Sequence, residues 1–249
     1  TAGTCGSDSA VDWMLDITLE IARERGEQLK IATLKSEQDR RRVTTAFDAG
    51  KITALHAAPA ISGSVIDECT NIVALAGIEQ IQAALKTGAD IIIAGRATDT
   101  AVIAALPIAR GCHRGAAWHG AKVAECGALA TTNPNSGVIL MSFDKTGFVI
   151  EPMAEFAAAT PYTVSAHMLY ENANPFILHE PGGYLDVSEA HYTALDKRIV
   201  RVEGSKWYDT RPYTVKLEAA RRVGYQTVSI VMVRDGHYRA HIADWVAAL

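Results

Sequence analysis

Residues 71–95 read NIVALAGIEQIQAALKTGADIIIAG, and this stretch decides the fold. A strand-like apolar run (71–76) is followed by an amphipathic segment that ends in glycine (77–88), and then by a second apolar run (89–95). The second run is continuous rather than alternating, which is typical of a strand buried on both faces of a parallel sheet. A strand, a helix and a strand joined by short connections predict a βαβ unit.

The same alternation extends to both sides of this unit. Apolar spacing and capping residues predict further helices over 7–25, 36–50, 97–111 and 115–132, and further strands over 29–34 and 51–59. After about residue 135 the pattern changes to short strands between glycine or aspartate turns, with one helix near 162–173. These later strands are expected over 137–144, 147–153, 183–187, 198–208 and 227–238.

The two patterns together predict an α/β fold class with two lobes. Residues 1–134 are expected to form a partly parallel three-layer sheet. Residues 135–249 are expected to form a mixed or antiparallel second lobe, with an uncertain boundary between the two.

Composition excludes several classes of protein. The 249 residues carry a net charge of −4, so no basic face for a nucleic acid is indicated. No apolar run approaches the roughly 18 residues of a membrane span. The four cysteines form no C-x-x-C pair, which argues against a disulfide scaffold or a zinc site and favours a reduced, cytoplasmic setting.

The opening loop, TAGTCGSDS (1–9), places glycines directly before a predicted helix. Free backbone N–H groups and the helix dipole favour an anion at such a point, so the candidate substrate-binding residues here are Gly3, Thr4, Gly6 and Ser7. A tight turn that only caps the helix is an equally good interpretation. A third interpretation makes Thr1 a processed N-terminal nucleophile, which the βαβ pattern disfavours. The loop matches neither the dinucleotide nor the phosphate-loop motif, so it identifies no cofactor.

The second candidate stretch, IIIAGRATDTAV (91–102), follows the buried strand. Ligands of open α/β sheets lie at the carboxyl ends of strands. Arg96 can hold a carboxylate or phosphate, and Asp99 can act as a base or cap the next helix. An Arg96–Asp99 ion pair without function is the alternative. If the sheet is parallel, Arg96 and the opening loop should meet at one edge and share an anion.

The third stretch is WHGAKVAECGA (118–128), a predicted helix with His119, Lys122 and Cys126 on roughly one face and Glu125 close to it. A histidine and a carboxylate together serve acid–base catalysis, so His119 and Glu125 are candidate catalytic residues. The pattern is not a metal motif, and no metal is expected. Cys126 is either a nucleophile or, more commonly for such a thiol, a buried structural residue.

The fourth stretch, SAHMLYENANPFILHEPGGYLDVSEAHY (165–192), is dense in polar and aromatic residues around a Pro-Gly-Gly turn. Loops of this kind commonly carry functional sites. Glu171 is a candidate base, and Tyr170 and Asn172 are candidate substrate-binding residues. The alternative is an irregular loop whose polar side chains cap local backbone groups. We expect this stretch and the 119–126 helix to converge near Arg96.

Five stretches carry a resemblance to a known family: residues 3–22, 88–106, 121–132, 167–187 and 213–227. In this order they resemble the acyclic terpene utilization (AtuA) family over nearly the whole chain. The resemblance implies a strand directly before Thr1, which makes the opening loop internal. It also implies a pathway through branched acyl-CoA thioesters and a small companion domain or subunit. It supplies no catalytic residue that can be assigned by position.

The candidate residues and the family resemblance together predict a function. It is a cytoplasmic catabolic enzyme that acts on a branched carboxylic acid or its acyl-CoA thioester by acid–base chemistry, as a hydratase, lyase or isomerase. Arg96 and the opening loop would hold the anionic end, while His119 and Glu125 or Glu171 would move protons. The alternative is a non-catalytic binding or scaffolding subunit that requires its companion. A homo-oligomer is expected in either case.

Overall fold

A computed structural model describes residues 2–3, 5–135 and 137–248 of the chain. Its helices are α1 (Asp8–Arg25), α2 (Arg40–Asp48), α3 (Gly63–Glu68), α4 (Ile78–Lys86), α5 (Asp99–Ala109), α6 (Arg114–Ala124), α7 (Pro161–Ala166), α8 (Gly236–Ala240) and α9 (Ile242–Ala247), with 3₁₀ turns η1 (Gly127–Ala130) and η2 (His167–Leu169). Its strands are β1 (Ile31–Leu34), β2 (Cys69–Ala74), β3 (Ile91–Ala94), β4 (Ile139–Phe143), β5 (Gly147–Pro152), β6 (Ile177–Glu180), β7 (Gly183–Asp186), β8 (His191–Ala194), β9 (Val200–Glu203), β10 (Lys206–Asp209) and β11 (Leu217–Arg221).

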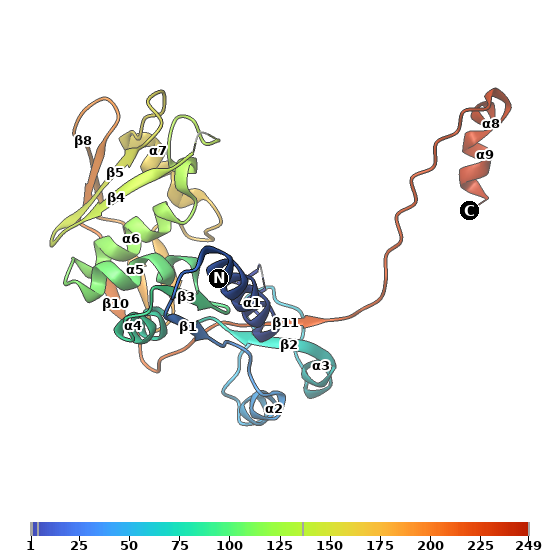
Figure 1. The fold of residues 1–249 in the computed structure, drawn as a ribbon, viewed down its shortest axis with the longest axis horizontal. Coiled ribbons are helices and arrows are strands. Elements are labelled where there is room, and N and C mark those ends of the chain that lie inside the picture. The colour runs from blue at the N-terminus through green and yellow to red at the C-terminus, as the bar shows by residue number, and fades with distance from the viewer. Residues whose placement is uncertain (1, 4, 136, 249) are drawn as a thin grey trace.

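The strands form small sheets of both kinds (Figure 1). β1 and β3 pair in parallel, with Ile31 opposite Ile91. The other sheets are antiparallel, in the orders β10-β7-β6, β11-β2 and β4-β5-β9-β8. The α/β fold class is therefore confirmed in general, with parallel pairing early in the chain and antiparallel pairing later. A three-layer core and two lobes that meet near residue 135 stay predictions. β11 returns to the early part of the chain, where it pairs with β2.

The three elements of the predicted βαβ unit lie where the sequence predicts them, as β2, α4 and β3, but β2 and β3 belong to different sheets. Ala76, just after β2, forms an isolated parallel bridge with Ala97, which follows β3. The Ala2 N–H donates to the carbonyl of Ala94 at 2.7 Å, so the opening loop starts beside β3. This places the loop and the residues after β3 at the same end of the strand.

The first helix, α1, lies close to the predicted range and ends at the predicted glycine. Ser7 caps α1 by accepting a hydrogen bond from the Ala10 N–H, and Gly26 ends the helix in the left-handed conformation. α2 differs from the expected start at Ser36, because Asp39 caps it instead. The Ser36 hydroxyl donates to the carbonyl of Arg96 at 2.9 Å, so it ties two loops together rather than starting a helix.

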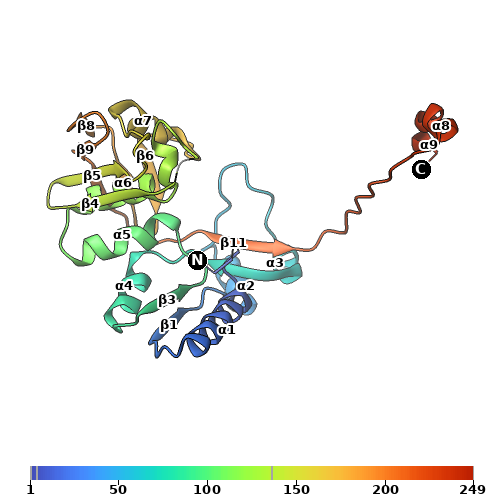
Figure 2. The same cartoon turned by 45° about the horizontal axis from the view of Figure 1, so that its top comes forward.

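Two predicted strands are wrong. Residues 51–59 form no strand, and residues 227–235 are extended without a ladder, while 236–240 belong to α8. Both stretches contain β-branched or apolar residues, but strand propensity depends on a partner strand that provides hydrogen bonds and packing. Within the described part of the chain neither stretch has such a partner. In Figure 2 the chain leaves β11 and runs away from the body to α8 and α9.

The main core surrounds α6. All its residues from Gly115 to Val123 are buried. α6 packs against α5 and against the sheet that contains β4 and β5. Gly120 allows the close approach, because a Cβ there would lie 3.0 Å from the ring of Phe148. Such burial on every face leaves little room for a polar residue of α6 unless that residue has partners.

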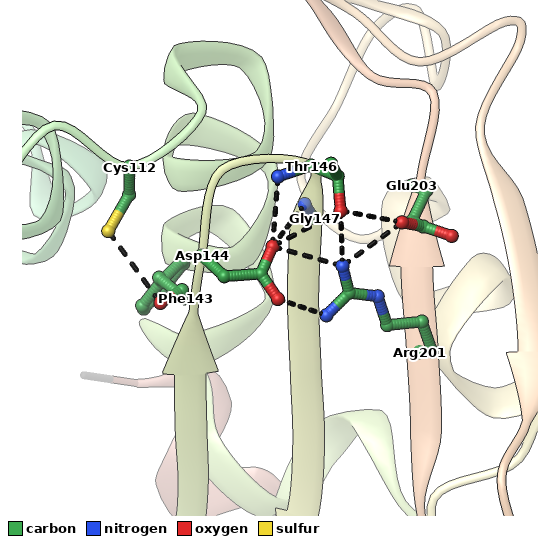
Figure 3. Close-up of polar contacts among 7 residues, drawn as sticks. All are labelled: Cys112, Phe143, Asp144, Thr146, Gly147, Arg201 and Glu203. Carbon is green, nitrogen blue, oxygen red and sulfur yellow. Dashed lines mark hydrogen bonds and ion pairs between the residues drawn. The ribbon is translucent and has the colours of Figure 1, made fainter.

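A network of charged groups fixes the β4–β5 turn (Figure 3). The Asp144 carboxylate accepts from the backbone N–H groups of Thr146 and Gly147, each at 2.9 Å. Arg201 of β9 bridges Asp144 and Glu203. The hydrogen bonds from Arg201 and from Thr146 hold the pKa of the Asp144 carboxyl well below its ordinary range. The turn is thereby attached to β9 at the surface of the sheet.

None of the described helices has the length and apolar character needed to cross a membrane.

Candidate functional site

A polar pocket of about 250 Å³ lies where the start of α5, the end of α6 and the segment before β7 meet. Its lining residues are Thr100, Lys122, Glu171, Asn172, Ala173, Asn174, Ile177, Leu178, His179 and Glu180. The 119–126 helix and the polar 165–192 stretch therefore meet at this pocket, while their convergence near Arg96 stays a prediction. Arg96 does not line this pocket.

Glu180, the last residue of β6, is the most perturbed acid of the pocket. Burial raises its pKa to about 7, and the nearby hydroxyls of Thr98 and Thr100 only partly oppose this effect. The negative charge of Glu125 adds to the rise. Its Oε2 atom is buried and has no hydrogen-bond partner among the described residues. A carboxyl with a pKa near 7 can both take and give a proton at neutral pH.

Glu125 and Lys122 form an ion pair at the end of α6, and both side chains are almost fully buried. Thr100 of α5 donates its hydroxyl hydrogen to the Glu125 Oε2 atom at 2.8 Å. Burial disfavours the charge on Lys122, but the hydrogen bond and the charge of Glu125 outweigh it and raise the pKa of the amine. Lys122 thus stays charged and places an ammonium group on the wall of the pocket.

Glu171 also lines the pocket, and its backbone has a φ of 58°. This left-handed conformation is uncommon for a non-glycine residue and carries a modest strain. Tyr170 hydrogen-bonds Glu171, and this bond raises the pKa of the tyrosine hydroxyl. The Asn172 side-chain amide donates to the carbonyl of Met168 at 2.8 Å, so it fixes the loop and lines the pocket as well.

His119 lies in the core rather than on the pocket. It has no exposed surface, its Nδ1 atom lies 2.7 Å from the Ser205 hydroxyl, and its ring packs against Phe148 and Tyr192. Burial, with a smaller effect of the nearby His167, lowers its pKa to about 3. A neutral histidine held in this way stabilises the core, and its placement gives no support to the expected catalytic role.

Arg96 and the opening loop meet as expected. The Arg96 N–H donates to the Gly6 carbonyl at 3.0 Å. The Arg96 side chain, however, already faces two carboxylates, with Glu218 at 3.5 Å and Asp99 at 3.8 Å. The sharing of one substrate anion by these groups stays a prediction.

A carboxylate of the protein itself, that of Glu37, lies at the N-terminus of α1. The Asp8 N–H donates to Glu37 Oε1 at 3.3 Å, and the Asn71 amide donates to the same oxygen at 2.6 Å. A substrate anion at this helix end would have to displace or join that carboxylate. Of the expected loop residues, Gly3, Gly6 and Ser7 are described, whereas Thr4, like Thr1, lies outside the described residues.

Cys126 is half-buried, and burial followed by the charge of Glu125 raises the pKa of its thiol. A protonated thiol is a poor nucleophile, so this geometry favours the structural interpretation. Among the described residues, no group of three or more histidines, cysteines or acids is placed to hold a metal ion.

The sequence reasoning missed Glu180 as a site residue, together with Lys122 and Thr100. Glu180 belongs to the polar 165–192 stretch, and its position between an apolar strand and a Pro-Gly-Gly turn was the available signal. Its raised pKa depends on α5 and α6 packing over it, which no local pattern shows.

Comparison with known proteins identifies a family. The model of the family described as acyclic terpene utilisation family protein AtuA matches residues 9–247. No curated protein and no solved structure matches the chain.

Proposed function

The chain belongs to the acyclic terpene utilisation (AtuA) family, and from this premise we propose that it is a catabolic enzyme that moves a proton next to the carbonyl group of its substrate. The proposed substrate is a branched carboxylic acid or its acyl-CoA thioester, and the reaction is of the hydratase, lyase or isomerase type. The observation that carries the proposal is Glu180, a half-buried carboxyl on a polar pocket with a pKa of about 7.

Glu180 is the proposed proton carrier. In its ionised form it takes a proton from the carbon beside the carbonyl group, and it returns a proton at another position or to a leaving oxygen. Its burial keeps the neutral and charged forms close in free energy at neutral pH, as this exchange requires. Glu125 is the weaker candidate for this role, because Lys122 and Thr100 already hold its carboxylate.

Lys122 is the proposed electrostatic partner. Proton removal beside a carbonyl group moves negative charge onto the carbonyl oxygen. The Lys122 ammonium group lines the same pocket as Glu180 and lies in a partly dry environment, where its charge is weakly screened. Glu125 orients the amine and offsets part of its charge, so Glu125 acts in this scheme as a positioning residue.

The test separates the three glutamates. Full-length protein is screened by thermal shift against branched carboxylic acids and their thioesters, and turnover is then measured on the compound that binds. Glu180→Gln should fold normally and lose on the order of 10²–10⁴-fold in turnover, the usual effect of removing a positioned acid or base. Glu125→Gln should lose less, and Glu171→Gln least.

Full turnover by Glu180→Gln would refute the proposed role of Glu180. If Glu171→Gln or Glu125→Gln were then the inactive variant, the proton carrier would be that residue instead. If all three variants kept full turnover, the pocket would not be the catalytic site.

A second candidate function is a binding or scaffolding subunit that requires a small companion protein. The observation that favours it is the apolar segment after β11, in which Val228, Ile230 and Met232 are 77%, 90% and 90% exposed. Exposed apolar residues of this extent are typical of a surface that another polypeptide covers. Activity of the isolated chain, compared with activity after the companion is added, distinguishes this candidate from the first.

A further inference from the structure

The hydroxyl of Thr100 lies between two acids of the polar pocket. It donates its hydrogen to Glu125 Oε2 at 2.8 Å. Burial raises the pKa of Glu180, and hydrogen bonds from Thr98 and from this same Thr100 hydroxyl oppose the rise. Thr100 is only 5% exposed, so water has little access to its hydroxyl. The proposed proton transfer does not use the contact between Thr100 and Glu180.

A threonine hydroxyl cannot donate to both acids at once. It has one hydrogen and two lone pairs, whereas an ionised carboxyl group only accepts hydrogen bonds. While Thr100 donates to Glu125, it can only accept from Glu180, and Glu180 can donate only when it carries a proton. If Glu180 is ionised, the Thr100 hydrogen has to turn toward it or leave it without this donor.

The other polar groups near the two acids do not remove this conflict. Lys122 holds Glu125 through the Oε1 atom, which leaves the Oε2 atom to Thr100. On the side of Glu180, Thr98 is the other nearby donor, and the buried Oε2 atom of Glu180 has no hydrogen-bond partner in the part of the chain that the structure describes. A buried carboxylate with so few donors depends on each one of them.

The charges that face Glu180 come from α6 and from the loop before β6. The negative charge of Glu125 raises the pKa of Glu180, and the ammonium group of Lys122 lowers it. Glu171 of the loop lines the same pocket, as does His179, the neighbour of Glu180 in β6. Because Glu125 and Lys122 act on Glu180 in opposite directions, the direction of a nearby hydroxyl can shift the balance.

We propose that Thr100 is a positioning residue that couples Glu180 to Glu125, an inference that rests on the proposed function of Glu180 as the proton carrier. While Glu180 holds the proton, the Thr100 hydrogen points to Glu125. When Glu180 gives its proton to the substrate, the hydroxyl rotates and donates to the new Glu180 carboxylate, while Lys122 still holds Glu125. The O–H bond of Thr100 does not break, so the hydroxyl stabilises the ionised base by rotation alone.

The ionisation of Glu180 can be followed without a substrate, by NMR of the glutamate carboxyl carbons in the full chain. The signal of Glu180 is identified by its absence in Glu180→Gln. Thr100→Val keeps the size and branching of the side chain but removes the hydroxyl, so the ionised Glu180 loses a donor. The titration midpoint of Glu180 should then rise by about one pH unit, as expected for one hydrogen bond to a charged group. Thr100→Ser keeps the hydroxyl and should retain the original midpoint.

Glu125→Gln tests the coupling from the other acid. It removes a negative charge, and its neutral amide competes less for the Thr100 hydrogen, so the midpoint of Glu180 should fall. When Glu125→Gln is combined with Thr100→Val, the fall should be smaller, because no hydroxyl can turn toward Glu180. The matched control is Thr45→Val in α2, whose hydroxyl donates to the backbone carbonyl of Arg41 at 2.8 Å. This control should leave the midpoint of Glu180 unchanged.

An unchanged Glu180 midpoint in Thr100→Val would overturn the proposal, and so would an equal shift in Thr45→Val. Equal effects of Glu125→Gln with and without the Thr100 hydroxyl would overturn it as well. Circular dichroism checks the fold, and Thr100→Ala, which removes the same hydroxyl, has to give the same rise if Thr100→Val does not fold.

Turnover distinguishes this proposal from the proposed function. On a compound that the protein converts, Thr100→Val should move the pH–rate profile to higher pH, and Thr100→Ser should not. Full turnover by Glu180→Gln would refute the role of Glu180 as the proton carrier, whereas the coupling measured by NMR would still stand. A shifted Glu180 midpoint with an unshifted pH–rate profile would overturn the role of Thr100 in the reaction.

Discussion

The backbone N–H of Arg96 donates a hydrogen bond to the carbonyl of Gly6 at 3.0 Å, across 90 positions of the sequence. This bond joins the opening loop to the turn after β3. Gly6 has a φ of 62°, and a Cβ at this position would lie 2.7 Å from the Cα atom of Arg96. The close approach of the two segments therefore depends on a residue without a side chain.

Gly6→Ala should destabilise the protein by several kcal/mol, because it combines a left-handed backbone with a direct clash against backbone atoms. Gly26→Ala is the matched control. Its φ is 67°, but a Cβ added there would meet no atom within 4 Å, so only the backbone cost of about 1 kcal/mol should remain. Urea unfolding of both variants measures the difference. Equal losses of stability would contradict the packing argument.

The sequence predicted the early elements well because their signals are local. The apolar runs that became β2 and β3, and the capped helix α1 between Ser7 and Gly26, need only neighbouring residues to be recognised. The meeting of Arg96 with Gly6 also followed, because parallel strands place the loops that adjoin one end at the same edge.

What failed depended on distant partners. The segment 51–59 resembles a strand, but no described strand lies beside it. β11 was not predicted, and it forms by pairing with β2 from more than 140 residues away. His119 was predicted to be catalytic from its local sequence alone. Its burial among Phe148, Tyr192 and Ser205 comes from elements far along the chain, which the local sequence does not show.

Two substitutions of Asp144 distinguish the contribution of the turn hydrogen bonds from that of the ion pair in the network of Figure 3. Asp144→Asn keeps an acceptor for the N–H groups of Thr146 and Gly147 but loses the charge that faces Arg201. Because the pair is solvent-screened, this loss should cost less than about 1 kcal/mol. Asp144→Ala also removes the two turn hydrogen bonds and should cost about 1–2 kcal/mol more. Thermal unfolding at neutral pH tests the order, and equal costs would show that the charge dominates.

His119 should make the fold sensitive to mild acid. Its folded pKa of about 3 lies below the ordinary value of 6.5, so the unfolded chain binds the proton first as the pH falls. The contribution of neutral His119 to the free energy of unfolding is fully present above about pH 6.5. It is lost progressively below that pH, and the loss is about 2 kcal/mol at pH 5.

His119→Asn keeps a group that can bond the Ser205 hydroxyl but cannot titrate. It should lower stability at pH 7, because the ring is lost, and reduce the change in stability between pH 7 and pH 5. His191→Asn, at an exposed histidine of β8, is the control and should leave that change intact. An unaltered pH dependence in His119→Asn would show that His119 does not become charged on unfolding in this range.

Glu180 should have the opposite pH dependence. Its folded pKa of about 7 lies above the ordinary value of 4.5, so the folded chain binds the proton more tightly than the unfolded chain. Its contribution to stability is full below about pH 4.5 and is lost as the pH rises through 7, with a cost of up to about 3 kcal/mol at pH 8. Glu180→Gln cannot ionise, so it should be more stable than the unmodified chain at pH 8 and within about 1 kcal/mol of it at pH 5. Glu155→Gln, at an exposed acid, should follow the unmodified chain at both values. Urea unfolding midpoints at the two pH values measure these differences in stability. If Glu180→Gln is no more stable than the unmodified chain at pH 8, the Glu180 carboxyl ionises without a cost in stability. Glu180 would then not be suited to proton transfer at neutral pH.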